Sequence, residues 1–217
     1  MALKCARRVG EIVKILRKAY PKAKTALGHK SAFELLISTI LSAQCTDKRV
    51  NKITPALFKK YNGPGSFARA KQTTLEKEIR STGFYRNKAK NIIAASKKIV
   101  EEFKGRVPDS MDKLTSLPGV ARKTANIVLS SSFHKAEGIA VDTHVRRLSG
   151  RIGLSKERDP NKIEKDLMKI IPPRDWLDFN YLLVDHGRRT CMARRPLCPE
   201  CIIRHLCPSA GKFNRGD

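Results

Sequence analysis

Hydrophobic residues recur along most of the chain at the three- and four-residue spacing of an α-helix. In the segment SAFELLISTILSAQ, the residues of one apolar face are Phe33, Leu36, Ile37, Ile40 and Leu41. Ser31 and Glu34 form a capping-box pattern, which marks the start of a helix. The alternation of apolar and polar residues that marks a strand never persists, so the sequence predicts an all-α fold.

Other helices are predicted from the same spacing and from residues that favour helix ends. A first helix carries Val9, Ile12, Val13 and Leu16 and ends at Pro21. A short helix is predicted over 47–52, and a new helix is predicted to start at Thr54-Pro55. Another is predicted to start at Thr73 with Glu76 and to end at Gly83, and a further helix to start at Asp159-Pro160. A helix over 89–103, ended by Gly105, is predicted to place on one side Ile92, Ile93, Ile99, Val100 and Phe103.

The segment LPGVARKTANIVL, residues 117–129, predicts a tight turn between a short helix and a longer one. Gly119 permits a positive φ and, without a Cβ, allows a phosphate close to the backbone. The first N–H groups of the following helix have no intrahelical acceptor, which favours anion binding. A Pro-Gly turn between helices is usually only a connector, so the pattern alone leaves both interpretations open.

The charge balance favours the anion site. Forty-five Lys and Arg stand against 20 Asp and Glu, a formal charge of +25 with a pI near 10.2. A polyanion such as nucleic acid is the partner that best explains this excess, although general basicity or attraction to an anionic membrane would also produce it. The chain has no apolar run suited to a membrane span, and its start, MALKCARRVGEIVKIL, lacks the features of a secretory signal. We therefore expect a cytoplasmic location, where thiols stay reduced.

Four of the six cysteines cluster in CMARRPLCPECIIRHLC, as Cys191, Cys198, Cys201 and Cys207. Four thiolates within so short a segment predict a closed metal site. The spacing does not separate zinc from an iron–sulfur cluster, because both accept four cysteines. Cys5 and Cys45 lie apart from this group and are predicted to be unligated.

The chain resembles the helix-hairpin-helix DNA glycosylases, specifically the endonuclease III family. The likeness lies in LPGVARKTANIVL, VDTHV, LLISTILSAQCTD, GFYRNKAKNI, HGRRTC and the terminal cysteines, and covers nearly the whole chain. The resemblance implies a six-helix barrel over 25–135, and a second helical domain formed by 1–24 and 136–217. It also implies a [4Fe–4S] cluster on the four clustered cysteines, and a monomer that acts on DNA at the nucleoid. Ala121 departs from the pattern, since the family often has a second glycine there.

The same resemblance implies a bifunctional enzyme, which removes oxidised pyrimidines from duplex DNA and then cuts the strand 3′ to the abasic site. Lys123 would attack the sugar and hold it as a Schiff base, and Asp142 would assist this chemistry. The amine must first lose its proton, which the helix amino end, Arg122 and partial burial would favour. The alternatives are that Lys123 pairs with a phosphate and that Asp142 only caps a helix.

A base stacked in a duplex must be rotated out before its sugar is reached. Gln44 resembles the polar residue that the family inserts into the vacated space. Phe84 lies where relatives often carry a leucine wedge, so the resemblance implies that its ring enters the duplex and stacks against neighbouring bases. The alternative for Phe84 is a core residue at a helix end. DNA binding is also expected from Gly119, Ala121, Arg122 and Thr124 of the hairpin. Two rival functions are a mismatch-type or pure AP-lyase specialist and a non-enzymatic DNA-binding module.

Overall fold

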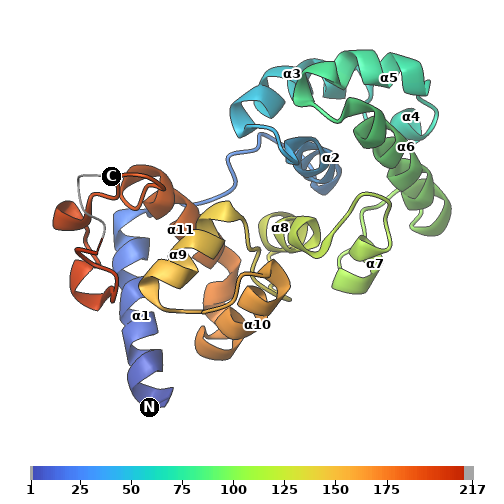
Figure 1. Cartoon of the computed structure of the whole chain (residues 1–217). Helices are drawn as coiled ribbons and strands as arrows, with labels where there is room; N and C mark the ends of the chain where they lie inside the picture. The colour runs from blue at the N-terminus through green and yellow to red at the C-terminus, as the bar shows by residue number, and fades with distance from the viewer. Residues whose placement is uncertain (1, 213–217) are drawn as a thin grey trace. The chain divides into compact units, whose positions relative to one another are not determined.

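The computed structural model describes the backbone of residues 2–212 and the side chains of residues 7–212 (Figure 1). The α-helices of this part are α1 (Ala2–Ala19), α2 (Ala32–Ser42), α3 (Asp47–Lys60), α4 (Pro64–Ala68), α5 (Gln72–Ile79), α6 (Tyr85–Glu102), α7 (Met111–Thr115), α8 (Arg122–Phe133), α9 (Thr143–Ile152), α10 (Pro160–Ile170) and α11 (Trp176–Arg189). Short 3-10 turns are η1 (Arg80–Thr82), η2 (Pro173–Asp175), η3 (Cys198–Glu200) and η4 (Arg204–Leu206). The described residues contain no strand, which confirms the predicted all-α class. None of the described helices is long and apolar enough to span a bilayer.

The chain divides into two compact units, each with its own hydrophobic core. The hairpin unit is Thr25–Glu137. The terminal unit is formed by Met1–Lys24 and Gly138–Asp217, as far as these are described. Segments from both sides of the hairpin unit in the sequence therefore form the terminal unit, while one continuous segment forms the hairpin unit.

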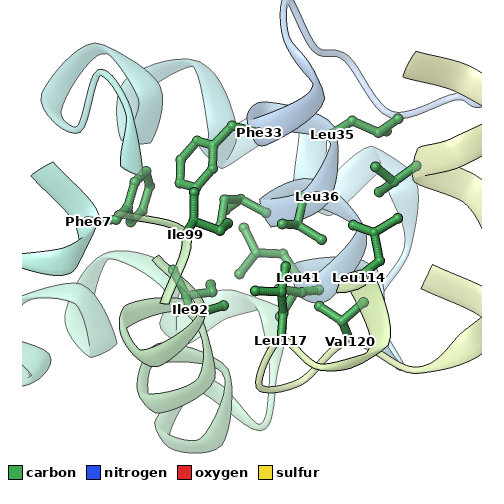
Figure 2. Close-up of a cluster of buried hydrophobic side chains, with 14 of the residues drawn as sticks. Phe33, Leu35, Leu36, Leu41, Phe67, Ile92, Ile99, Leu114, Leu117 and Val120 are labelled. Atoms are coloured by element: carbon green, nitrogen blue, oxygen red, sulfur yellow. The ribbon is translucent and has the colours of Figure 1, made fainter. Parts of the chain in front are cut away.

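The core of the hairpin unit is built around α2, which is buried on nearly every side. All five residues of its predicted apolar face are buried, and so are Leu35, Ser38 and Thr39. Figure 2 shows side chains of α2, α4, α6, α7 and the α7–α8 connection in this core, including Phe33 of α2 and Phe67 of α4, whose ring centroids are 5.6 Å apart. Because α2 packs against α3, α6 and α8, it fixes the positions of the loops that these helices begin or end.

The terminal unit packs α1 against α10 and α11, and α9 against α10 and α11. The predicted apolar face of α1 is buried, with Val9, Ile12 and Leu16 fully enclosed. Polar contacts hold this helix at two positions, near its middle and near its carboxyl end. Arg17 binds both carboxylate oxygens of Asp178, and Arg8 donates to the carbonyl oxygens of Ile152 and Leu206 at 2.8 and 2.9 Å.

Most predicted helix ends are observed. Ser31 caps α2 by accepting from the Glu34 N–H at 3.2 Å, although the Glu34 carboxylate accepts from Lys30 rather than from Ser31. Asp159 caps α10 by accepting from the N–H groups of Asn161 and Lys162. Gly105 ends α6 with φ +74° and donates to the Ile99 carbonyl oxygen at 2.9 Å.

Three local predictions were wrong. The helix break at Thr54-Pro55 is absent, because α3 runs unbroken from Asp47 to Lys60 and buries Val50, Thr54 and Leu57 along one side. Core packing thus outweighs the hydrogen bond that Pro55 removes. The second wrong prediction was the cap at Thr73, since α5 begins at Gln72 after Lys71 and has no side-chain cap. The third concerned Val100, which is exposed rather than part of the apolar side of α6.

The α7–α8 turn contacts α6 directly. Gly119 has φ +77°, and a Cβ added to it would lie 2.7 Å from the Cβ of Asn91 on α6. Such a contact is closer than side chains tolerate, so the turn needs glycine for both its backbone conformation and its packing. The neighbouring Leu117 and Val120 are buried, as is Val128 on α8, so apolar packing supports the hairpin from behind.

We expect Gly119→Ala to destabilise the hairpin unit more than Gly105→Ala. Both positions have a similar positive φ, but nothing lies within 4 Å of a Cβ at Gly105. Left-handed backbone alone lowers the free energy of unfolding by about 1–2 kcal/mol. The contact with Asn91 should remove about 1–3 kcal/mol more. Urea unfolding of the two variants measures the difference, and equal losses would show that the contact is relieved without cost.

Candidate functional site

The amino end of α8 is open to an anion. Ala121 is its N-cap residue, and no side chain caps the helix. The backbone hydrogen bonds begin with the Ala125 N–H donating to Ala121 at 3.0 Å, so the N–H groups of the first turn have no acceptor within the helix. Arg122 and Thr124 are half-buried beside this end. The predicted phosphate-binding residues of the hairpin are therefore grouped around one uncapped helix start.

Lys123 lies in that first turn and is exposed. The opposite face of α8 is buried through Ala125, Val128 and Leu129, and α8 packs on α2. This packing directs Lys123 away from the core of the hairpin unit. The partial burial expected for its amine is not observed.

Gln44 and Phe84 both occupy left-handed backbone, with φ of 53° and 47°. Gln44 is exposed in the turn between α2 and α3. Phe84 is the N-cap residue of α6, and 63% of it is exposed, so the interpretation as a core residue was wrong. Non-glycine residues in this conformation are uncommon and cluster at functional sites. The two residues predicted to enter the duplex are therefore exposed and conformationally strained.

Asp142 belongs to the terminal unit and caps α9, as predicted. Its Oδ1 accepts from the Val145 N–H at 2.8 Å, and the residue is half-buried. Capping occupies one carboxylate oxygen and fixes the rotamer of the side chain. Oδ2 is left for another partner, so the cap and a chemical role are compatible.

The four clustered cysteines line one pocket in the terminal unit. Cys191 follows α11, Cys198 begins the turn η3, Cys201 follows that turn, and Cys207 follows η4. All four are half-buried free thiols, and burial raises the pKa of the thiols of Cys201 and Cys207. Among the described residues, no three His, Cys, Asp or Glu side chains are grouped to hold a single metal ion, although the four cysteines line the same pocket.

Two residues that the sequence reasoning did not single out contact these thiols. Arg151 of α9 donates to the Cys191 Sγ at 3.4 Å and to the carbonyl oxygens of Met192 and Ala193 at 2.7 Å. The Nε2 of His186 lies 3.6 Å from the Cys201 Sγ, and its Nδ1 lies 3.0 Å from the Tyr20 hydroxyl. Burial lowers the pKa of His186 to about 4, so its ring is neutral at neutral pH. Such long-range contacts give no local sequence signal.

Cationic side chains surround the cysteine loop. Five arginines near it in the sequence are all exposed: Arg188, Arg189, Arg194, Arg195 and Arg204. Cys45 lies apart, half-buried against the core of the hairpin unit. The prediction for Cys5 falls on a side chain outside the described residues.

Comparison with known proteins identifies the class. A family model for "HhH-GPD superfamily base excision DNA repair protein" matches residues 37–173. The chain is 56% identical over 203 residues to endonuclease III of Synechocystis sp., covering 94% of this chain and 93% of that protein. It is 42% identical over 212 residues to endonuclease III of Bacillus subtilis, covering 97% and 93%.

Solved structures agree. A non-covalent endonuclease III–DNA complex matches with a TM-score of 0.89 at 42% identity, over 95% of this chain and 97% of that one. A trapped endonuclease III–DNA covalent intermediate, in an estranged-adenine complex, matches over the same shares with a TM-score of 0.90. The chain thus belongs to the helix-hairpin-helix superfamily of base excision DNA repair proteins. Within it the chain is a member of the endonuclease III family, whose enzymes are DNA glycosylases with AP-lyase activity, and this protein is one of them.

Proposed function

We propose that this enzyme removes oxidised pyrimidines from duplex DNA, with the amine of Lys123 as its nucleophile and Asp142 as its catalytic partner. One observation carries the assignment of Lys123. The residue is exposed in the first turn of an uncapped helix, directly after the close turn at Gly119. A phosphate bound at that helix end would bring the deoxyribose of the same strand to the amine.

The chemistry follows from this placement. The Lys123 nitrogen attacks C1′, the bond from C1′ to the base breaks, and the base leaves with a proton. The nitrogen loses its own proton and the sugar ring opens, which leaves a Schiff base between Lys123 and the sugar. Removal of a C2′ proton then expels the 3′ phosphate and cuts the strand. The Asp142 carboxylate would stabilise positive charge at the sugar and assist these proton transfers.

The lesion class is supported by the relative trapped with an estranged adenine. Adenine pairs with thymine, so a damaged pyrimidine is the natural counterpart of an adenine left unpaired. For this chain we propose that Gln44 and Phe84 fill the space left by the extruded nucleotide. Gln44 would hydrogen-bond the orphaned base, and the exposed ring of Phe84 would stack on its neighbours.

The cysteine pocket fits a [4Fe–4S] cluster, which requires four thiolate ligands. Cys191, Cys198, Cys201 and Cys207 would hold it, and Arg151 would keep its hydrogen bond to a ligand sulfur. When bound, the cluster would crosslink the loop and so keep the surrounding arginines in place for DNA phosphates.

The two units and the net charge also fit this function. We propose that the hairpin unit is the six-helix barrel of the family and that the terminal unit is its cluster domain. The net charge of +25 suits a monomer that binds duplex DNA through its phosphates, at the nucleoid of the cytoplasm.

Borohydride reduction during incubation with DNA tests Lys123. Wild-type enzyme and a duplex carrying an oxidised pyrimidine should give a covalent adduct, because borohydride reduces the Schiff base. Lys123→Ala should give none, whereas Lys113→Ala, an exposed lysine on α7, should retain it. An adduct that persists without Lys123 would refute its role. Wild-type protein that forms no adduct with any oxidised pyrimidine would point to a binding module instead.

Asp142→Asn separates capping from chemistry. Asn caps helices about as well as Asp, so stability should change no more than in Asp159→Asn, the same substitution at the cap of α10. The single-turnover rate of base removal should fall by about 100-fold or more, because the carboxylate charge is lost. Urea unfolding and rapid-quench kinetics measure the two effects. A rate within about twofold of wild type would leave Asp142 as a cap alone.

Metal analysis tests the cysteine pocket. Purified protein should be brown and contain about four iron and four sulfide per chain. Cys198→Ser should lower both contents, while Cys45→Ser should retain them, since Cys45 lies in the other unit. A colourless protein with stoichiometric zinc and no sulfide would overturn the assignment.

A further inference from the structure

Lys88, in the first turn of α6, is a lysine that the proposed chemistry does not use. It is 5% exposed, and its Nζ donates to the carbonyl oxygens of Leu41 and Thr82, each at 2.8 Å. Leu41 lies in the last turn of α2, three residues before Gln44. Thr82 ends η1, two residues before Phe84. One side chain therefore joins the two loops that present Gln44 and Phe84.

The backbone of Lys88 adds a third connection. Its N–H donates to the Phe84 carbonyl oxygen at 3.0 Å, which is the first hydrogen bond of α6. The Lys88 side chain thus holds the residue two before Phe84, and its backbone holds Phe84 itself. All these contacts lie within the hairpin unit.

The buried ammonium group of Lys88 is held by backbone carbonyls rather than by an ion pair. Its hydrogen bonds go to backbone carbonyls, and no carboxylate forms an ion pair with it among the described contacts. Burial lowers the pKa of Lys88, which reflects the loss of hydration. The carboxyl end of α2 offsets part of this penalty, because its carbonyls carry the negative end of the helix dipole. Enclosing a cation without a counter-ion is a poor route to stability, so its main effect is on geometry.

The geometry that needs fixing is at Gln44 and Phe84. Left-handed backbone is unfavourable for residues other than glycine and persists only where neighbouring contacts determine it. Lys88 anchors the carbonyl groups shortly ahead of both positions. Without this anchor each loop would be free to relax toward ordinary backbone, and the two side chains would lose their fixed separation.

We propose that Lys88 is a positioning residue that couples the Gln44 and Phe84 loops, so that both side chains enter the duplex as one unit when a nucleotide is extruded. Lys88 itself contacts no DNA in this scheme. The inference rests on the proposed roles of Gln44 and Phe84, and it adds that these roles depend on each other through one buried ammonium group.

Lys88→Met tests the coupling, because methionine has a similar length and no hydrogen-bond donor. Lys97→Met is the charge-matched control at an exposed position of the same helix. Each enzyme is assayed on a duplex with an oxidised pyrimidine and on single-stranded DNA with a preformed abasic site. The second substrate has no base to extrude and no partner strand.

We expect Lys88→Met to lower kcat/KM on the duplex by about tenfold or more, and to change abasic-site cleavage in single strands by less than about twofold. Lys97→Met should stay near wild type on both substrates. Equal losses on the two substrates would show a general structural role and overturn the proposal, as would full activity of Lys88→Met on the duplex. If Lys88→Met does not fold, Lys88→Gln, which also removes the charge and shortens the reach, is assayed in the same way.

A double-mutant cycle separates this inference from the proposed function. In a Gln44→Ala, Phe84→Ala background, Lys88→Met should lower duplex activity by no more than about twofold further, because coupled residues are not additive. The same tenfold loss in both backgrounds would refute the coupling while leaving the roles of Gln44 and Phe84 intact. Full duplex activity in the background itself would instead refute those roles.

Discussion

A buried ammonium group that donates to two backbone carbonyls fixes the exposed loops of Gln44 and Phe84 in the hairpin unit. Lys88 joins the carboxyl end of α2 to the residues that start α6. Asn91 lies three residues after Lys88 on α6 and packs against the hairpin turn at Gly119. Residues three apart lie on the same face of a helix, so one face of α6 locates Gln44, Phe84 and the start of α8. Gln44 and Phe84 are exposed, but the Lys88 side chain that holds their loops is buried.

Strain and charge are distributed differently in the two units. Among the described residues, all four non-glycine residues with left-handed backbone belong to the hairpin unit: Gln44, Phe84, Lys104 and His134. Its buried core supplies the rigidity that keeps these conformations in place. In the terminal unit the exposed feature is a group of arginines, and the rigidity comes from hydrogen bonds of Arg151 and from the neutral ring of His186. In both units a buried polar contact holds a loop whose exposed side chains suit DNA.

Local spacing predicted most helix faces and helix ends, although the cap expected at Thr73 is absent. The faces of α1 and α2, the caps Ser31, Asp142 and Asp159, and the stop at Gly105 depend on residues a few positions apart. Prediction failed where packing against residues distant in the sequence decides the local structure. Pro55, for example, lies inside α3 because Val50, Thr54 and Leu57 share a side of this helix that is buried in the core. Lys88 is the clearest case, since its partner Leu41 lies 47 residues away and nothing nearby distinguishes it from a surface lysine. The resemblance pointed to Gln44 and Phe84 but not to what holds them.

The two ends of the hairpin turn differ in what they require of the residue present. Gly119 has φ +77° and touches Asn91, so both backbone and packing exclude a side chain. Ala121 has φ −88°, which any residue adopts, and it is exposed. The departure from the family pattern at Ala121 therefore falls where the backbone does not need glycine. An added methyl there affects only how closely a phosphate can approach, while the helix end itself keeps its N–H groups. The proposed anion site therefore needs glycine at position 119, whereas the backbone at position 121 does not require it.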